Sequence, residues 1–449
     1  MGANLPPELW DQVISEIAPG NRRIMDTDSD IMAFKTLIAC TCTAKDLALS
    51  ARRRLFATIA IDKQAMQLHN DREPLKMRTI EEIGARVDQL INLLTNDLSP
   101  IRLMVQRFSI YIDFARDMLK EGSQLCRLLE ILPHRAVNIT FLTMHTSVLS
   151  LPVSWNEIPT LMLNHLRNLC MTLPVYQLSL YDNKDIPPTI VNSRQSPHLR
   201  CIKFSYSRFS QTMANPEQSQ VIFHDYLHLL PEYGVYEINF TNDLLNFVRI
   251  HASVNKHRDN VQRLSMLLTK SDVQGSLTSL HWGCFALDEL PSTTNFGLFQ
   301  VLRRITVELS LFEKDYSSDV FLLLPASLHH SGTSNWEVEN IKMILNVRWH
   351  RWSANVLPVN FNNVDYLGMK YSIDRLRPLY PQLRKFKFCL CVEAQPDSYD
   401  IYSSRLEGVR TKLMETFSLD VPLAVSGGSP TMYTSVQLEI ETRVEVKST

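Results

Sequence analysis

The sequence predicts an α/β fold, in which a small helical module is followed by a long, irregularly repeating body with a parallel sheet. Three observations indicate this: an apolar stripe near the N-terminus, a short apolar motif that recurs along the body, and helix-like stretches between its copies. The 449 residues are 45% hydrophobic and 21% charged, within the ordinary range of globular proteins. A chain of this length has room for two or three structural units.

Charge and hydropathy exclude several classes of protein. The formal net charge is -1, so no overall field attracts the chain to nucleic acid or to an anionic membrane. No apolar run is long enough to cross a bilayer, and Asp11 and Glu16 interrupt the region where a signal peptide has its apolar core. Eight scattered cysteines do not form a disulfide framework. We therefore expect an intracellular protein, cytoplasmic or nuclear, with no nucleic-acid or membrane partner.

A short amphipathic helix is expected at the start of the chain. Pro6 and Pro7 stand at its entry, where the missing N–H of proline costs nothing. Its apolar residues recur at helical spacing and form a broad stripe: Leu9, Trp10, Val13, Ile14 and Ile17. The stripe is wide for one short helix, so it can cover both an internal core and a partner. A second apolar helical run over residues 34–56 and a short strand over residues 57–61 follow.

These blocks resemble the F-box of proteins from mushroom-forming fungi. The resemblance lies in "LPPEL" from Leu5, in "TLIACT" from Thr36 and in "RRRLF" from Arg52, which occur in this order. It implies that residues 1–62 form a three-helix module that docks onto the Skp adaptor of a Skp–cullin–F-box ubiquitin ligase. The positions that match the family's adaptor contacts are Leu5, Pro6, Leu9, Val13, Ile14 and Leu37. An amphipathic helix can lay its apolar face into a partner's groove. The alternative from the pattern alone is that all six side chains form the module's own core.

Residues 63–104 are expected to be a helical linker between this module and the body. Their apolar residues recur at helical spacing over one long segment: Ile80, Ile83, Val87, Leu90, Ile91 and Leu94.

The body carries an internal repeat. Residues 197–204 and 381–388 both fit P-x-L-R-x-[IF]-K-F, and a looser pattern, apolar-x-x-apolar-x-apolar, recurs between and around them. The last two apolar residues of each copy are two apart, which is the period of a strand. The ten copies are Val105/Phe108/Ile110, Ala136/Ile139/Phe141, Val175/Leu178/Leu180, Leu199/Ile202/Phe204, Val235/Ile238/Phe240, Leu277/Leu280/Trp282, Leu302/Ile305/Val307, Val338/Ile341/Met343, Val364/Leu367/Met369 and Leu383/Phe386/Phe388.

A strand and a helix in each unit resemble a leucine-rich repeat, whose unit also ends on a polar residue, here Asn183, Ser207, Asn346 or Cys391. We therefore predict a degenerate leucine-rich-repeat-like solenoid over residues 105–394, closed by a C-terminal helix and strand over residues 395–449. The alternative is a non-repeating α/β body with a parallel sheet. Side chains between the core positions are expected on the concave sheet face, where a protein substrate can bind: Ser179, Lys203, Asn239, His281, Thr306 and Lys387.

No motif indicates bond chemistry. His224 and His228 stand four residues apart on an expected helix, a zinc-compatible spacing, but no third ligand lies nearby in sequence. Cys389 and Cys391 lack metal-ribbon spacing and are interpreted as small core residues. No phosphate loop, dinucleotide fingerprint or nucleophile elbow occurs. We therefore predict no catalytic residue, cofactor or metal.

Three functional hypotheses remain at this point. The leading one is a non-enzymatic F-box adaptor that binds the Skp subunit of a cullin ligase and presents an unknown protein substrate through its repeats. The second is a ligase-independent scaffold with a degenerate F-box. The third is an enzyme, which requires a deep pocket of ionisable groups in the body.

Overall fold

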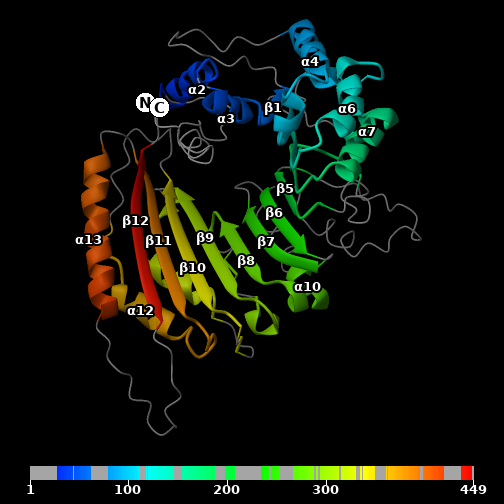
Figure 1. Ribbon diagram of the computed structural model, residues 1–449. Coiled ribbons are helices and arrows are strands. Elements are labelled where there is room, and N and C mark those ends of the chain that lie inside the picture. The colour runs from blue at the N-terminus through cyan, green and yellow to red at the C-terminus, as the bar shows by residue number, and fades with distance from the viewer. Residues whose placement is uncertain are drawn as a thin grey trace. The chain divides into compact units, whose positions relative to one another are not determined.

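The structure is a computed structural model, in which the chain divides into two compact units, Met1–His228 and Leu229–Thr449. Both units are mixed α/β, and their strands pair mainly in parallel (Figure 1), which confirms the α/β class with a parallel sheet that the sequence predicts. The structure describes residues 28–43, 45–61, 79–111, 118, 120–145, 154–187, 198–205, 207, 234–241, 244–252, 266–287, 290–291, 294–312, 315–329, 334–335, 337–348, 361, 363–394, 398–418 and 436–446.

The first unit alternates helices with short strands. Its elements are α2 (Asp28–Cys40), α3 (Lys45–Leu55), β1 (Thr58–Ile61), α4 (Ile80–Thr95), α5 (Ile101–Met104), β2 (Arg107–Tyr111), α6 (Gln124–Arg135), β3 (Phe141–His145), η1 (Trp155–Glu157), α7 (Thr160–Thr172), β4 (Gln177–Tyr181) and β5 (Cys201–Ser205).

Strands β1 to β5 form a parallel sheet in chain order. Two rows of apolar residues align across it: Ile59, Phe108, Leu142, Leu178 and Ile202, and then Ile61, Ile110, Met144, Leu180 and Phe204. From β2 to β5 every member of both rows is at most 1% exposed. The apolar positions predicted for β2, β4 and β5 are therefore core positions, and the short strand expected after the N-terminal module opens the sheet.

The predicted unit Ala136/Ile139/Phe141 is wrong by three residues. The structure aligns Ile139, Leu142 and Met144 with the unit of β2, while Phe141 pairs with Arg107. The N–H of Ala136 donates to Leu132 O and ends α6. Both sets of residues fit the same spacing, so the pattern alone does not distinguish them.

A layer of helices covers one face of this sheet. Helix α4 occupies the expected segment and begins with a capping box, in which the Thr79 hydroxyl accepts from the N–H of Glu82 and the Glu82 carboxylate accepts from the N–H of Thr79. Its buried residues are Ile83, Gly84, Val87, Ile91 and Leu94. Helix α4 packs against α6, and α6 packs against α7. The expected linker helix therefore belongs to the helical layer of the first unit.

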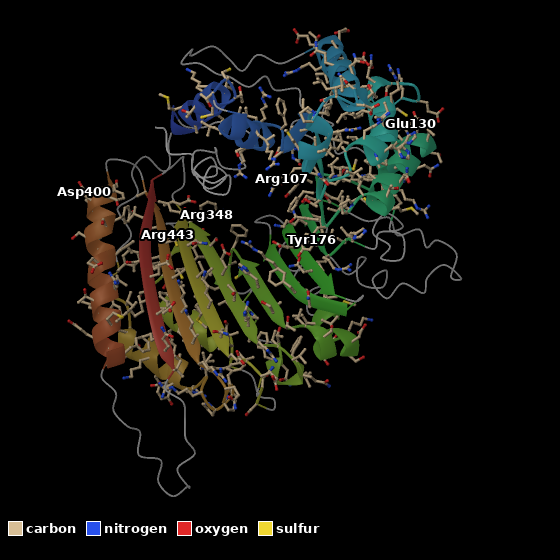
Figure 2. The ribbon with its side chains drawn as sticks, in the orientation of Figure 1. Arg107, Glu130, Tyr176, Arg348, Asp400 and Arg443 are labelled. Carbon is tan, nitrogen blue, oxygen red and sulfur yellow. The ribbon has the colours of Figure 1, made fainter. Side chains whose placement is uncertain are left out.

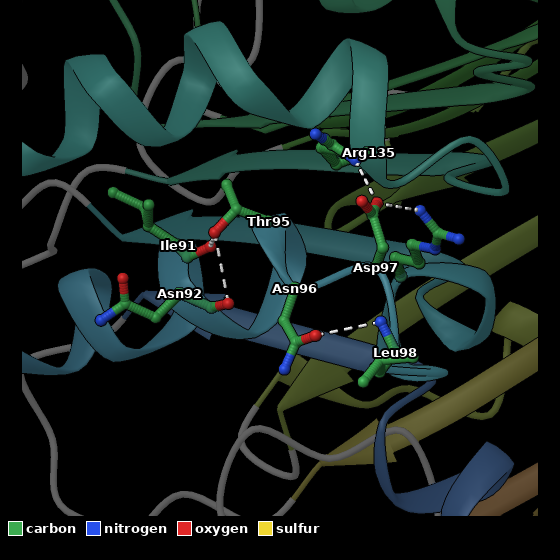
Figure 3. A network of polar contacts seen from close by, with 8 residues as sticks. Ile91, Asn92, Thr95, Asn96, Asp97, Leu98 and Arg135 are labelled. Atoms are coloured by element: carbon green, nitrogen blue, oxygen red, sulfur yellow. Dashed lines mark hydrogen bonds and ion pairs between the residues drawn. The ribbon is translucent and has the colours of Figure 1, made fainter.

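The turn between α4 and α5 is tied down by polar contacts (Figure 3). The side chain of Asn96 accepts from the N–H of Leu98 at 3.0 Å. The carboxylate of Asp97 lies 3.0 Å from Arg102 and 2.7 Å from Arg135 of α6. These contacts fix the turn relative to α6, although Leu98 itself is 93% exposed.

A buried asparagine links three strands where β4 ends. The amide of Asn183 donates to Tyr181 O at 2.6 Å and to Met144 O at 3.2 Å, and its oxygen accepts from the indole N–H of Trp155 at 3.1 Å. Its backbone N–H donates to Ser207 Oγ, which donates to Leu180 O. The predicted polar ends of these two units therefore satisfy buried backbone groups of neighbouring strands.

The second unit has longer strands. Its elements are β6 (Gly234–Thr241), β7 (Leu244–Ala252), α10 (Ser271–Ser276), β8 (Ser279–Cys284), η5 (Phe296–Leu298), β9 (Arg304–Phe312), α11 (Val320–Ala326), β10 (Asn340–Arg348), α12 (Tyr366–Asp374), β11 (Lys385–Ala394), α13 (Tyr399–Ser418) and β12 (Gln437–Val446). The C-terminal helix and strand expected over residues 395–449 are present as α13 and β12.

Strands β7 to β12 are parallel and lie in chain order, whereas β6 is antiparallel to β7. Only two residues separate β6 from β7, and a parallel crossover needs a dozen or more. The predicted unit at Val235 therefore does not continue the parallel repeat. Its place is taken by Leu245, Val248 and Ile250 of β7, which fit the same spacing and which the sequence reading missed. Val248 and Ile250 pair with Leu280 and Trp282 of β8.

The predicted unit Val364/Leu367/Met369 is wrong because it lies in a helix. The carboxylate of Asp365 accepts from the N–H of Gly368 and caps α12. Met369 and Ile373, four residues apart, are buried, while Leu367 is 71% exposed. Apolar residues in and just before a short helix such as α12 can match the apolar-x-x-apolar-x-apolar spacing by chance.

Helices cover one face of the second sheet. The ring of Phe321 in α11 lies 5.4 Å from that of Phe388 in β11, α12 packs between α11 and α13, and α13 packs on β11 and β12. The core rows are Val248, Leu280, Ile305, Ile341 and Phe386, and then Trp282, Val307, Met343 and Phe388. Strand β12 continues them with the half-buried Leu438 and Ile440. None of the helices in the described parts of the chain is long and apolar enough to pass through a lipid bilayer.

Candidate interaction surface

The face of each sheet opposite its buried rows carries polar side chains, because successive residues of a strand point to opposite sides. We call this the open face. All six residues predicted for a substrate surface lie on strands at open-face positions, one residue after a buried core position: Ser179 on β4, Lys203 on β5, Asn239 on β6, His281 on β8, Thr306 on β9 and Lys387 on β11. Their role as a substrate surface stays a prediction.

The strand pairing shows that these six residues do not form one continuous row, as the sequence analysis expects for a single concave face. In the first unit Ser179 pairs with Lys203, and Ser179 is only 3% exposed. In the second unit His281 and Thr306 are neighbours, but Asn239 pairs with Phe247 because β6 is antiparallel. Thr306 and Lys387 are separated by Lys342 of β10.

Two residues of the same row in the second unit were missed from the sequence. Lys342 stands between the buried Ile341 and Met343, and Arg249 pairs with His281. Lys387 was selected because it stands between the last two apolar residues of its predicted unit. Lys342 has the same place in the predicted unit Val338/Ile341/Met343, so the same rule could have selected it. Arg249 was missed because the unit on β7 was not recognised.

A buried carboxylate lies at the centre of the open face of the second unit. Glu308 is 8% exposed, and its Oε2 lies 2.9 Å from His281 Nε2 and 3.9 Å from Arg249. Its Oε1 accepts from the amide of Asn346 at 2.8 Å, and the same amide donates to Ser310 Oγ. These contacts satisfy a charge that is costly to bury alone. They position His281 and Asn346 on the strand surface.

A ladder of ion pairs joins β11 to β12. Lys385 lies 2.6 Å from Glu439, and Lys387 lies 2.7 Å from Glu441 and 3.9 Å from Glu439. The hydrogen bond to Glu441 is the main cause that raises the pKa of Lys387, and it likewise lowers the pKa of Glu441. Both groups therefore remain charged over a wider pH range than usual. On β11 the two lysines are two residues apart, and on β12 the two glutamates are also two residues apart. The equal spacing lets both ion pairs form side by side.

Two thiols lie beside this ladder on β11. Burial raises the pKa of the Cys389 thiol to about 11. Burial also raises the pKa of Cys391, although Arg443 Nε, 3.1 Å from its sulfur, acts in the opposite direction (Arg443 is labelled in Figure 2). Both thiols are protonated at neutral pH, and a thiol is a nucleophile or metal ligand only as the thiolate. Cys389 and Cys391 are buried, as expected for small core residues, but they alternate with Phe388, Leu390 and Val392 and therefore lie on the open face.

The open face of the first unit carries aromatic side chains instead. The ring of His145 lies edge-on between those of Tyr111 and Tyr181, and its Nε2 lies 3.2 Å from Asp182. The guanidinium of Arg107 lies 4.2 Å from the ring centroid of Phe141 (Arg107 is labelled in Figure 2). These residues follow the strand register and were not singled out from the sequence, because they belong to no spaced motif.

The predicted adaptor contacts are only partly within the described residues. Leu5, Pro6, Leu9, Val13 and Ile14 lie outside them. Leu37 is 1% exposed and packs with Ala51 between α2 and α3, and the partly buried Cys40, Leu47 and Leu55 surround this pair. Leu37 is therefore a core residue of the helix pair, as the alternative interpretation expects, and offers no surface to a partner.

Within the ranges given above, no group of three or more His, Cys, Asp or Glu side chains is arranged to hold a metal ion. His224 and His228 lie outside these ranges. The polar contacts of the two open faces described above are pairs and short networks.

No family model matches the sequence, and no curated protein matches it significantly.

Proposed function

We propose that this chain is a non-enzymatic F-box substrate receptor, which binds the Skp adaptor of a cullin ubiquitin ligase through its N-terminal module and holds a protein substrate on its repeating body. The observation that carries the proposal is the order of "LPPEL", "TLIACT" and "RRRLF" within residues 5–56. The second and third blocks contain parts of α2 and α3, which pack on one another around Leu37 and Ala51. The proposed adaptor contacts are now Leu5, Pro6, Leu9, Val13 and Ile14.

The repeating register of the two sheets supports the second half of the proposal. Each parallel strand adds a polar strip beside its neighbour, so the open faces offer broad surfaces of the kind that repeat proteins use for binding. We infer a leucine-rich-repeat-like body with returns of uneven length. In such a receptor the mechanism is proximity: a substrate lysine held near a charged conjugating enzyme reacts at a raised effective concentration.

Co-purification with the Skp adaptor tests the proposal. The full chain should capture the adaptor, and Leu9→Asp with Ile14→Asp should abolish capture while leaving the circular dichroism spectrum unchanged. Leu98→Asp with Leu161→Asp is the matched control, because both leucines are exposed and lie outside the predicted contacts. This control should capture the adaptor as the wild type does.

Two results would speak against the proposal. If the wild-type chain does not capture the adaptor, the alternative of a ligase-independent scaffold replaces it. If both double variants capture the adaptor equally well, the binding surface lies elsewhere on the chain.

A further inference from the structure

A band of basic side chains crosses the open face of the second unit. Two neighbouring rows of the register carry it, and from β7 to β11 they contain Phe247, Arg249, Ser279, His281, Arg304, Thr306, Asn340, Lys342, Lys385 and Lys387. We call the five arginines and lysines of this set, namely Arg249, Arg304, Lys342, Lys385 and Lys387, the basic band. No acidic residue occurs in either row between β7 and β11.

The charge of the basic band is only partly neutralised. Lys385 and Lys387 pair with Glu439 and Glu441 of β12. The side chain of Arg304 is exposed and that of Lys342 is half-buried, and neither forms an ion pair with any residue in the described ranges. Arg249, at the β7 end of the band, lies 3.9 Å from Glu308. Arg304 and Lys342 are therefore the two cations of the basic band that have no ion-pair partner in the described ranges.

We propose that the basic band binds an acidic, extended segment of a partner protein. This inference rests on the proposed function, since it names the chemical class of the substrate that the receptor holds. Strand β12 indicates which chemistry fits: glutamates two residues apart on an extended chain meet lysines two residues apart on β11 at 2.6 and 2.7 Å. A partner segment with the same Glu-x-Glu spacing can place its carboxylates against Arg304 and Lys342.

Size and charge favour a short protein segment. From β7 to β11 the band spans about 19 Å, which an extended chain crosses in about six residues. The whole chain has a net charge of -1, so a long polyanion gains nothing from the rest of the surface. The positions that pair with Arg304 and Lys342 hold Asn340 and Thr306, which admit a peptide but offer no ring on which a base can stack. The aromatic rings of the two rows, those of Phe247 and His281, lie on β7 and β8.

Fluorescence anisotropy with the purified full chain tests this proposal. The probes are labelled peptides of about ten residues, long enough to cross the band: one alternates Glu and Ser, one alternates Lys and Ser, and a labelled uridine oligonucleotide of similar length is the third. The acidic peptide should bind, and its affinity should fall steeply as salt rises past ~0.15 M, where the Debye length is about 8 Å. The other two probes should not bind.

Substitutions in the band should change affinity in opposite directions. Arg304→Glu with Lys342→Glu should weaken binding of the acidic peptide about tenfold or more, because each change replaces attraction by repulsion. Glu439→Gln should strengthen it a few-fold, because Lys385 loses its internal partner. Arg410→Glu with Lys412→Glu is the matched control, since both residues are exposed on α13, and it should leave affinity unchanged. Unchanged circular dichroism spectra exclude misfolding.

The outcomes distinguish this inference from the proposed function. Equal affinity of the wild type and of the Arg304/Lys342 variant overturns the inference, and so does absence of acidic-peptide binding or equal binding of the oligonucleotide. Capture of the Skp adaptor without acidic-peptide binding overturns the inference and leaves the F-box proposal standing. Peptide binding without adaptor capture overturns the F-box proposal and leaves this inference standing, because a ligase-independent scaffold then binds the acidic partner.

Discussion

The two units use one apolar spacing to build strands of different length. Strands β2 to β5 have five residues each, whereas β9 to β12 have nine or ten. In the second unit the core face continues for two further apolar residues, such as Leu309 and Leu311 on β9 or Leu390 and Val392 on β11, all at most 3% exposed. In the first unit the corresponding position after Leu180 is Asp182, whose φ of 56° ends β4.

This difference decides what the open face can present. A five-residue strand with two core positions presents three side chains on the opposite face before the chain turns, and in the first unit these are mostly small or aromatic, such as Ser179 and Tyr181. A long strand adds further outward positions, which in the second unit hold Glu308, Asn346 and Glu441. The same repeat thus provides a compact stacked core in one unit and a broad charged surface in the other.

The strongest test of this comparison removes one core ring from each unit. Phe204 of β5 and Phe388 of β11 occupy equivalent register positions and are at most 1% exposed. Phe204→Ala and Phe388→Ala should each cost about 3–5 kcal/mol of unfolding free energy, through lost burial and the cavity that remains. Because the units are separately compact, calorimetry should show two transitions. Each variant should lower only the transition of its own unit, and a single shared shift would contradict the division.

A smaller difference in unfolding free energy is expected between substitutions of Asn183 and Asn346, which occupy the same position in their repeat units. Asn183→Ala should cost about 2–4 kcal/mol, because it strands the carbonyls of Met144 and Tyr181 and the indole N–H of Trp155 in the interior. Asn346→Ala should cost about 1–2 kcal/mol, because Glu308 keeps His281. Urea unfolding of the two variants measures the difference. Equal losses would mean that the two units end their repeats in the same way.

The sequence predicts much of the repeat but not its register everywhere. Seven of the ten predicted units fall on parallel strands with the expected core positions, because burial on one face imposes the two-residue period. The errors arise where the pattern is ambiguous. Ile139 fits two overlapping units, Leu367 fits a helix as well as a strand, and the two-residue link before β7 reverses the direction of β6.

The candidate surface is predictable only in part. The rule that selects residues beside core positions identifies His281, Thr306 and Lys387, and it could have identified Lys342. It does not identify Glu308, since that residue lies past the third apolar position, where only strand length decides whether the chain still belongs to the sheet. Ion pairs such as Lys385–Glu439 depend on the pairing of β11 with β12, whose partner residues are 52 positions apart in the chain.

Thiol reactivity tests how well the long strands β11 and β12 shield their cysteines from solvent. Cys389 and Cys391 are buried on β11, while Cys42 is exposed after α2. Iodoacetamide at neutral pH should therefore modify Cys42 much faster than either strand thiol, which mass spectrometry of tryptic peptides can follow. The rate at Cys389 should rise with pH until the pKa of about 11 is passed, provided the unit stays folded. Rapid labelling of Cys389 at neutral pH would show that β11 and β12 separate readily.

The smallest expected effect concerns the ion pairs between β11 and β12. Glu439→Gln should change the unfolding free energy by about 0.2–1 kcal/mol, because Lys385 and Glu439 both keep about a third of their side-chain surface in solvent. The lowered pKa of Glu441 means that its pair with Lys387 is fully formed above the ordinary carboxyl pKa and is lost as the pH falls through the lowered value. The stability difference between the wild type and Glu441→Gln should therefore vanish in acid. A difference that persists when the carboxylate is protonated would show that the glutamate stabilises β12 by packing, and the charged ladder would then be a surface for partners more than a part of the fold.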